Sequence, residues 1–389
     1  MDKRSVKVLI VCQWPLGGIR TYLKYVYSLF PRDEFAVTIL ANPVTDQESF
    51  VEDMAAADIK VVWAKPVLAV KDTLSLWTLA LLARGRYDLI HSQGFISAVH
   101  VAVVNLLFRI PHVLTIHGIV EGKYFKGRLG WLKHRLLYLL LRNVSVFHGV
   151  GEDILEHFKR AFPGLQKGKA RWVVITNGIR PERFLAKNDD APRQLRTRLG
   201  VNRETAIFGF FGRFMPQKGF NYIIEAVARI KKKSPQHGNL VVLAVGSGDF
   251  ERECRQEVKA AGVEETFIFH PFDPQVVDFI KGCDAVLMPS NWEAYPILTS
   301  EVFCCGIPLI ASDCIGLREA TRHTPALVVP VGDVEALAEK MVTVMTSSAA
   351  RQAHQTFRVE AAERFDVKHS AEKLLGLFRE VQRRVRTVD

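Results

Sequence analysis

Residues 206–219 have the sequence AIFGFFGRFMPQKG, which predicts a buried β-strand followed by a loop and the start of a helix. The apolar run Ala206–Phe211 lacks polar alternation, which is typical of a strand covered on both faces of a parallel sheet. Arg213 lies just past the end of this strand, and Lys218-Gly219 opens the next helix. Two cations in these positions can clamp a diphosphate; the alternative is that both are solvated surface cations.

The same alternation of strand and helix continues on both sides of this stretch. After it, strands are predicted at Leu240–Val245, Thr266–Phe269, Ala285–Pro289, Pro308–Ala311 and Ala326–Val329. Before it, strands are predicted at Val6–Val11, Phe35–Ala41, Ile59–Trp63, Asp88–His91, His112–His117, Val144–Val150 and Val173–Thr176. Helical segments between such strands indicate an α/β class with two doubly wound, Rossmann-like domains. A length of 389 residues also favours two domains.

A polar segment near residues 177–202 divides the two series of strands and is predicted to be the linker. We therefore place an N-terminal Rossmann-like domain at residues 1–185 and a C-terminal Rossmann-like domain at residues 186–370. Residues 371–389 contain an amphipathic helix, which we expect to return to the first domain. Doubly wound domains bind ligands at the carboxyl ends of their strands, so a central cleft between two facing domains is the expected site.

Residues 291–301, NWEAYPILTSE, are the most informative for chemistry. Glu293 lies in the loop after a predicted strand, and Glu301 lies about one turn into the next helix. Between the two glutamates, the amides of Ile297, Leu298 and Thr299 lie at a helix N-terminus, where N–H groups lack partners and favour an anion. The stretch predicts a phosphate seat flanked by carboxylates that suit the hydroxyl pairs of a ribose or a sugar.

Two features of the first half follow predicted strands. Gly17 and Gly18 let a loop approach a ligand closely before a helix begins, although a plain tight turn is the alternative. His117 ends a predicted strand and would face the cleft; the alternative is a structural histidine. The six cysteines form no CxxC pair and have no histidine at a metal-ligand offset, so no metal site is predicted.

These motifs together resemble the GT-B glycosyltransferases of family GT4, over essentially the whole chain. The resemblance lies in Glu293-x7-Glu301 followed by residues 306–313, in Gly212-Arg213-x4-Lys218-Gly219, and in residues 175–179. It implies a GT-B fold in which residues 1–185 are the acceptor-binding domain and residues 186–370 are the nucleotide-sugar-binding domain. It also implies a nucleotide-diphosphate sugar as donor, retention of anomeric configuration, and neither metal nor other cofactor. The residues leave the base, the sugar, the acceptor and the oligomeric state open.

The resemblance also implies roles in the second domain. Arg213 and Lys218 would neutralise the donor diphosphate, together with the helix N-terminus at Ile297, Leu298 and Thr299. Glu301 would bind the ribose hydroxyls, and Phe272 would lie near the base. Glu293 would hold hydroxyls of the donor sugar near the reacting carbon.

In the first domain, the resemblance implies that the Gly17-Gly18 loop closes over the phosphates and that His117 faces the transferred sugar. The sequence departs from commoner members of the family in three places. Glycine follows His117 where aspartate is frequent, Tyr295-Pro296 replaces Phe-Gly, and Cys304-Cys305 replaces a small apolar pair. None of these changes removes a charged residue to which the resemblance assigns a role. The replacement by Tyr295-Pro296 can alter the shape of the sugar pocket.

The charge is unevenly distributed along the chain, whose formal net charge is +11. Residues 1–180 have 24 Lys and Arg against 14 Asp and Glu, whereas residues 181–389 have 28 against 27. Within 123–142, cations alternate with aromatic and leucine residues and no acid occurs, which is typical of an interfacial membrane helix. The predicted membrane-facing cations are Lys123, Lys126, Arg128, Lys133 and Arg135. The alternative is a core helix with a solvated basic face.

The start of the chain lacks the features of a secretory signal, and no apolar run reaches the ~20 residues that span a bilayer. We expect a cytoplasmic protein, peripheral on the inner face of the cell membrane.

The predicted function is a retaining, metal-independent hexosyltransferase acting on a membrane-linked acceptor, such as a glycan or glycolipid of surface polysaccharide or lipopolysaccharide synthesis. The alternatives are a GT-B-fold sugar-nucleotide epimerase and a non-catalytic membrane- or nucleic-acid-binding protein. Two carboxylates beside the anion site argue against nucleic acid as the partner.

Overall fold

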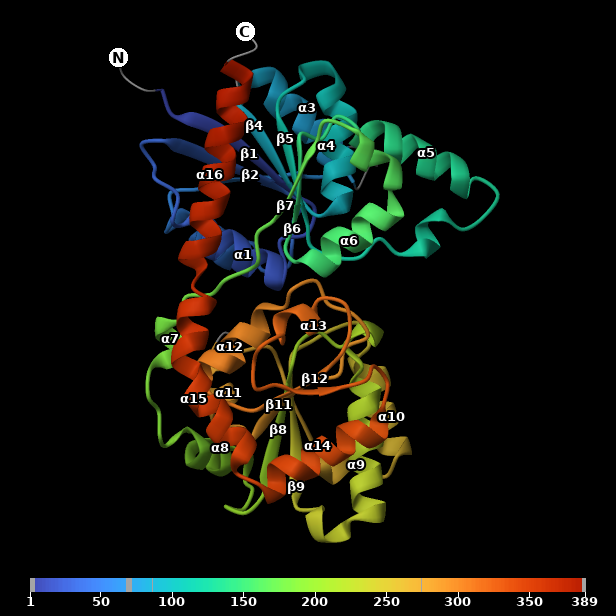
Figure 1. Cartoon of the computed structure of the whole chain (residues 1–389), viewed down its shortest axis with the longest axis vertical. Helices are drawn as coiled ribbons and strands as arrows, with labels where there is room; N and C mark the ends of the chain where they lie inside the picture. The colour runs from blue at the N-terminus through green and yellow to red at the C-terminus, as the bar shows by residue number, and fades with distance from the viewer. Residues whose placement is uncertain (1–3, 68–71, 86, 274, 387–389) are drawn as a thin grey trace. The chain divides into compact units, whose positions relative to one another are not determined.

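The computed structural model describes residues 4–67, 72–85, 87–273 and 275–386, which form two compact units. The first unit comprises residues 1–178 and 367–389, and the second comprises residues 179–366. Each unit contains a parallel sheet with helices on both faces (Figure 1). The predicted α/β class with two Rossmann-like, doubly wound domains is therefore confirmed.

The sheet of the first unit has seven parallel strands in the order β3-β2-β1-β4-β5-β6-β7. Its strands are β1 (Val6–Cys12), β2 (Phe35–Ala41), β3 (Lys60–Trp63), β4 (Leu89–Gln93), β5 (His112–Ile116), β6 (Val146–Gly149) and β7 (Arg171–Val174). The central strand β1 is buried from Val8 to Cys12, as its unbroken apolar run predicts. Ile10 pairs with Ile39 on one side and with His91 on the other.

The helices of the first unit cover both faces of this sheet. They are α1 (Gly18–Tyr27), α2 (Gln47–Ala55), α3 (Leu74–Arg84), α4 (Phe95–Phe108), α5 (Gly130–Leu141), α6 (Glu152–Ala161) and α16 (Val367–Arg386), with 3-10 turns at Gly122–Phe125 and Pro163–Lys167. Side chains of α1, α2 and α16 pack on one face of β1 and β2, and side chains of α3 and α4 pack on the other.

The last helix, α16, completes the core of the first unit and lies along its sheet (Figure 1). It begins at Val367, four residues before the predicted start, and buries the predicted apolar face of Leu374, Leu375, Phe378 and Val381. The Phe378 ring meets Phe30 edge-on with centroids 5.7 Å apart. Arg379 forms an ion pair with Glu34 at 2.5 Å.

The second unit has six parallel strands in the order β10-β9-β8-β11-β12-β13. They are β8 (Ala206–Phe211), β9 (Leu240–Val245), β10 (Phe267–His270), β11 (Ala285–Met288), β12 (Leu309–Ser312) and β13 (Leu327–Val329). Its helices are α7 (Glu182–Leu185), α8 (Ala191–Leu199), α9 (Phe220–Lys233), α10 (Glu251–Ala260), α11 (Val276–Gly282), α12 (Ile297–Cys305), α13 (Leu317–Ala320), α14 (Val334–Thr346) and α15 (Ala349–Arg364), with 3-10 turns at Pro216–Lys218, Pro235–His237 and Glu264–Thr266.

The chain passes between the two units inside the range 177–202 predicted for the linker, but the connection is much shorter than that range. The chain leaves the first unit at Gly178 and re-enters it at Val367, and residues 182–185 and 191–199 form α7 and α8 of the second unit. Pro192, in this polar segment, lies in the first turn of α8, where its missing N–H costs nothing. Leu195 is buried against β8 and β9, so one apolar residue per turn fixes a helix that is otherwise polar.

In each sheet the direction of strand addition reverses beside the first strand, between β1 and β4 in the first unit and between β8 and β11 in the second. Ligands of doubly wound folds bind outside the carboxyl ends of the strands at such reversals. The loops after β1, β4 and β5, and those after β8 and β11, are therefore the places to look for a site. Among the described residues, no helix has the length and apolar character needed to cross a bilayer.

Candidate active site

The loops after β8 and β11 are bonded to each other at the strand reversal of the second unit. The amide of Asn291 donates to the carbonyl of Gln217 at 2.8 Å, and the Gln217 side chain donates to the carbonyl of Trp292 at 3.0 Å. The hydroxyl of Tyr222 donates to Oδ1 of Asn291 at 3.0 Å. Two loops separated by about seventy residues therefore act as one rigid support for the side chains that they carry.

Lys218 and Glu293, each predicted from its own motif, form an ion pair on this support. Nζ of Lys218 donates to Oε1 of Glu293 at 2.7 Å, and the Ser290 hydroxyl donates to the same oxygen at 2.7 Å. Glu293 is only 5% exposed, and its amide donates to the carbonyl of Ile315 at 2.9 Å. A carboxylate with two donors on one oxygen keeps its second oxygen, Oε2, for a ligand.

Glycines make room for this close approach of loops. Gly219 has φ 66°, and a Cβ there would lie 2.1 Å from the carbonyl oxygen of Pro289. Gly316 has φ 80°, and a Cβ there would lie 2.3 Å from the carbonyl oxygen of Ala294. The Lys-Gly pair of the motif therefore sets the separation of the two loops as well as supplying a cation.

Arg213 and Phe272 are the two exposed members of the predicted donor site. Within the described part of the chain, the Arg213 guanidinium has no recorded hydrogen bond or ion pair. The backbone beside it is fixed, because the amide of Phe214 donates to the carbonyl of Ser247 at 3.1 Å. Phe272, after β10, is 71% exposed. An unpaired guanidinium and an open aromatic ring are both available to a ligand, and their predicted roles stay predictions.

The α12 N-terminus follows Pro296 and places the amides of Ile297 and Leu298 in the first turn, where intrahelical partners are absent, whereas the amide of Thr299 donates to the carbonyl of Pro296 at 3.3 Å. The Thr299 hydroxyl donates to the carbonyl of Pro296 at 2.7 Å, which holds the entry to the helix. Glu301 lies one turn further along α12 and is partly buried. Burial raises the pKa of Glu301 to about 7, against the opposing effect of the nearby Arg183.

The predicted glycine loop of the first unit lies between β1 and α1. Gly17 has φ 54°, and neither Gly17 nor Gly18 has an atom within 4 Å of the position of a Cβ, so the loop borders open space. The helix that follows is anchored by Arg20, which pairs with Asp46 and Asp53, both at 2.8 Å. The loop is therefore an uncrowded stretch on a fixed helix, as a phosphate-covering role requires.

His117 lies just beyond β5 and contacts residues of two other elements. Its Nε2 donates to Oε1 of Gln93 at 2.7 Å, and its ring meets that of Tyr22 edge-on with centroids 5.2 Å apart. Burial, and to a smaller extent the neighbouring His148, lower the pKa of His117 to about 3. The ring is neutral at physiological pH and is suited to hydrogen bonding.

Sequence reasoning missed a chain of buried polar side chains beneath His117. His148 Nε2 donates to the carbonyl of Ile175 at 2.9 Å, so its Nδ1 accepts from the Thr115 hydroxyl at 2.8 Å. The Thr115 oxygen in turn accepts from Nε2 of His91 at 2.5 Å, and Tyr27 donates to the other nitrogen of His91. Polar residues inside apolar strands at 91–93, 115 and 148 were the signal in the sequence.

The basic segment exposes its apolar residues rather than burying them. Along α5 only Gly130 and Leu141 are buried, whereas Trp131 is 66% exposed and Leu136 is 56% exposed. The described cations of the predicted surface are all exposed: Lys126, Arg128, Lys133 and Arg135. The side chain of Lys123 lies outside the described part of the structure. A core helix with a solvated basic face would bury more leucines than α5 does.

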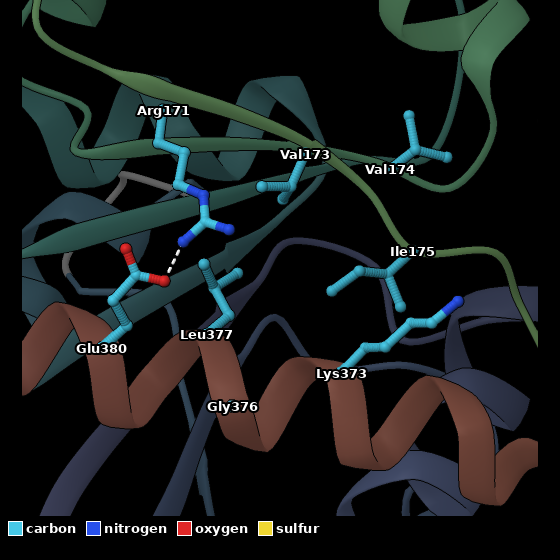
Figure 2. Close-up of a pocket in the computed structure, with 8 residues that line it drawn as sticks. All are labelled: Arg171, Val173, Val174, Ile175, Lys373, Gly376, Leu377 and Glu380. Atoms are coloured by element: carbon cyan, nitrogen blue, oxygen red, sulfur yellow. Dashed lines mark hydrogen bonds and ion pairs between the residues drawn. The ribbon is translucent and has the colours of Figure 1, made fainter.

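A pocket of about 400 Å³ lies elsewhere in the first unit, between β7 and α16 (Figure 2). Val173, Ile175 and Leu377 line it, and the ion pair of Arg171 with Glu380 crosses one end. It contains none of the predicted site residues. In the described ranges no three histidine, cysteine or acidic side chains are grouped as metal ligands.

Comparison with protein families matches both units. The model of the family "Glycosyl transferases group 1" matches residues 193–361, and that of the "Glycosyl transferase 4-like domain" matches residues 17–178. Together the two matches include most of both units, and they contain every predicted donor-site residue.

Similar proteins span nearly the whole chain. The Escherichia coli UDP-Gal:alpha-D-GlcNAc-diphosphoundecaprenol alpha-1,3-galactosyltransferase is 21% identical over 386 residues, covering 96% of this chain and 97% of that protein. The crystal structure of Anabaena HepE in complex with UDP and glucose has a TM-score of 0.79 at 21% identity, covering 96% of this chain and 100% of that one. WaaG, a glycosyltransferase involved in lipopolysaccharide biosynthesis, has a TM-score of 0.71 at 16% identity, covering 95% and 98%.

Proposed function

The chain belongs to the group 1 glycosyltransferases, GT4-like enzymes of GT-B fold that act on nucleotide sugars, and we propose that it is a retaining, metal-independent hexosyltransferase with a membrane-linked acceptor. The observation that carries this proposal is the bonded pair of loops after β8 and β11. They hold Lys218 and Glu293 2.7 Å apart, next to the N-terminus of α12 in the chain. This arrangement offers positive charge to a diphosphate and a carboxylate to a sugar.

In the proposed reaction, the bond between the anomeric carbon and the diphosphate oxygen breaks while the acceptor hydroxyl forms a bond on the same face of the sugar. The acceptor proton passes to the departing diphosphate, which leaves as the nucleoside diphosphate. Arg213, Lys218 and the amides at Ile297 and Leu298 would stabilise the negative charge that develops there. Glu293 would orient hydroxyls of the transferred sugar through its Oε2.

Metal independence is proposed because the protein itself supplies the positive charge. A guanidinium without a recorded protein partner, an ammonium fixed by its carboxylate, and a helix N-terminus are three separate sources of stabilisation for a diphosphate. Glu301 would accept hydrogen bonds from the ribose hydroxyls, and the exposed ring of Phe272 would lie against the base.

A membrane-linked acceptor is supported by the surface of the first unit. The exposed cations Lys126, Arg128, Lys133 and Arg135 lie in the same short segment as the exposed Trp131 and Leu136, the combination that binds an anionic membrane interface. The Escherichia coli relative is named for an acceptor linked to diphosphoundecaprenol, which is a lipid. We propose that the enzyme works at the inner surface of the cell membrane, on a precursor of a surface polysaccharide or lipopolysaccharide.

A donor panel tests the proposal. Thermal shifts are measured with UDP, GDP and ADP sugars, since a ligand that binds the folded state raises the melting temperature by mass action. We expect one nucleotide class to stabilise the protein and its sugar to be transferred only when a lipid-linked acceptor is present. Isomerisation of the donor sugar without any acceptor would instead favour the epimerase alternative, and no shift with any donor would overturn the proposal.

A further inference from the structure

The ring of His117 is fixed by a side chain that no motif predicted, that of Gln93. Oε1 of Gln93 lies 2.7 Å from Nε2 of His117. A carbonyl oxygen only accepts, so Nε2 has the proton and Nδ1 is left as a hydrogen-bond acceptor. The Tyr22 ring, edge-on at 73° to the imidazole, restricts rotation of the ring away from this arrangement.

Gln93 is itself held in place. It is the last residue of β4, is 2% exposed, and pairs in register with Thr115 of β5. Nε2 of His91, on the same face of β4, packs 3.4 Å from the amide nitrogen of Gln93, longer than an ordinary hydrogen bond. His91 belongs to the buried chain that runs through Thr115 and His148 to the carbonyl of Ile175. Burial at the end of β4 and the bond to His117 therefore hold the side-chain amide of Gln93.

We propose that Gln93 is a positioning residue for His117: it keeps the proton on Nε2 and presents Nδ1 as an acceptor to a hydroxyl group of the reacting sugars. The proposal rests on the function proposed above, because that function supplies the hydroxyl. His117 is the group that contacts substrate, and Gln93 acts through it.

The surroundings of His117 keep the imidazole neutral. The titratable groups that face it are Tyr22 on α1, His91 on β4 and His148 on β6, and all three are buried. Burial lowers the pKa of His148 to about 4 and that of His91 well below its usual value, so neither adds charge at pH 7. Nδ1 of His117 therefore stays an acceptor throughout the neutral range.

Gln93→Glu and Gln93→Leu test the proposal through kcat. A carboxylate beside Nε2 raises the pKa of His117, and the protonated ring has no acceptor at Nδ1. We expect Gln93→Glu to lose kcat at pH 6–7 and to recover it as the pH rises. Gln93→Leu should lower kcat about threefold to tenfold at every pH, the effect of one neutral hydrogen bond. The donor KM should change in neither variant.

Asn105→Ala is the matched control in the same part of the first unit. Asn105 is 4% exposed, and its side chain bonds to the backbone of Ile110 at 2.7 and 2.9 Å, so its loss should lower stability and leave the pH profile of kcat unaltered. A Gln93→Glu profile parallel to that of the wild type would overturn the proposal.

A second measurement needs neither substrate nor turnover. Long-range proton–nitrogen NMR spectra of the ligand-free, histidine-labelled full chain show which nitrogen of each ring has the proton. The chain has 12 histidines, so His117→Asn identifies the signal of His117. We expect the Nε2–H form in the wild type and a mixture in Gln93→Leu, whereas an Nδ1–H form in the wild type would overturn the proposal. If no donor is turned over, the proposed function fails, but this spectrum still decides the role of Gln93.

Discussion

Nζ of Lys218 lies 2.7 Å from Oε1 of Glu293, so the cation expected at the diphosphate and the carboxylate expected at the sugar form an ion pair with each other. The pair links the loop after β8 to the loop after β11, and the Ser290 hydroxyl donates to the same carboxylate oxygen. Donor binding would then find both groups in place, with little side-chain entropy left to lose.

The pair should be visible in stability. Lys218→Met leaves the 5%-exposed carboxylate of Glu293 without its cation, and we expect a loss of about 1–3 kcal/mol, as for an unsatisfied buried group. Adding Glu293→Gln to that variant should restore part of the loss. Chemical denaturation of the wild type, both single variants and the double variant gives the coupling energy, and strictly additive losses would mean that the pair contributes nothing.

In kinetics, Glu293→Gln should lower kcat and alter donor KM little.

Arg213 should matter for turnover and not for folding. Its guanidinium is exposed without a recorded partner, so Arg213→Ala should leave the melting temperature unchanged. It should lower kcat/KM by about 10- to 150-fold, which corresponds to the ~1.5–3 kcal/mol of a hydrogen bond to a charged group. Arg203→Ala is the control, because Arg203 is an exposed arginine that precedes β8 and so lies at the opposite end of that strand. Equal kinetics in the two variants would remove Arg213 from the donor site.

The fold was largely predictable because its strands are continuous apolar runs, and β2, β8 and β9 have the bounds that the sequence predicted. Helices whose burial depends on tertiary contacts were harder to predict. The polar α8 was mistaken for a linker because only Leu195 and Ala191 are buried. Helix α15, which precedes α16, was not predicted at all, because Phe357 is the one large apolar side chain among its four buried residues.

The candidate site also contains residues that could be predicted from the sequence and residues that could not. Charged groups next to glycines in sequence motifs, such as Lys218 and Glu293, were predicted, because their positions after strands fix where they lie. Gln93 was not, because its importance comes from register, which places the end of β4 beside β5 and so next to His117. No spacing along the chain shows that contact.

Donor affinity should depend on pH through Glu301. Burial raises the pKa of Glu301 to about 7, and the ionised carboxylate is the better acceptor for the ribose hydroxyls. We therefore expect the donor Kd to fall as the pH rises from 6 to 8, and this trend to be absent in Glu301→Gln. Glu301→Ala should mainly raise donor KM, because ribose contacts change little between ground and transition state. Calorimetric titration at three pH values measures the affinity, and an identical trend in Glu301→Gln would assign it to another group.

Ionisation of Glu301 should strengthen donor binding but lower the stability of the ligand-free protein as the pH rises. Its pKa in the folded state lies above the ordinary 4.5, so between about pH 4.5 and 7 the folded state binds more protons than the unfolded state. The free energy of unfolding should therefore fall with rising pH in that window, relative to Glu301→Gln. Denaturation curves of both proteins at pH 5 and pH 7.5 check this, and parallel changes would contradict it.

The basic segment at residues 126–135 should bind anionic membranes. Neutralising Lys126, Arg128, Lys133 and Arg135 to glutamine should reduce flotation with anionic vesicles and turnover of a lipid-linked acceptor, while leaving donor affinity unchanged. The binding should weaken at high salt, because exposed charges are screened beyond ~8–10 Å. The matched control neutralises four exposed cations of the second unit, Arg203, Lys232, Arg252 and Lys259. If the wild-type protein does not float with anionic vesicles at low salt, an acceptor that is not bound to a membrane is favoured.

The most direct test of the central proposal is the anomeric configuration of the product, determined by proton NMR after transfer from an α-linked nucleotide sugar in buffer containing EDTA. The account predicts release of the nucleoside diphosphate and formation of an α-linked glycoside, since the acceptor attacks the face that the diphosphate leaves and the protein supplies the positive charge. A β-linked product, or activity that EDTA abolishes and magnesium or manganese restores, would contradict it.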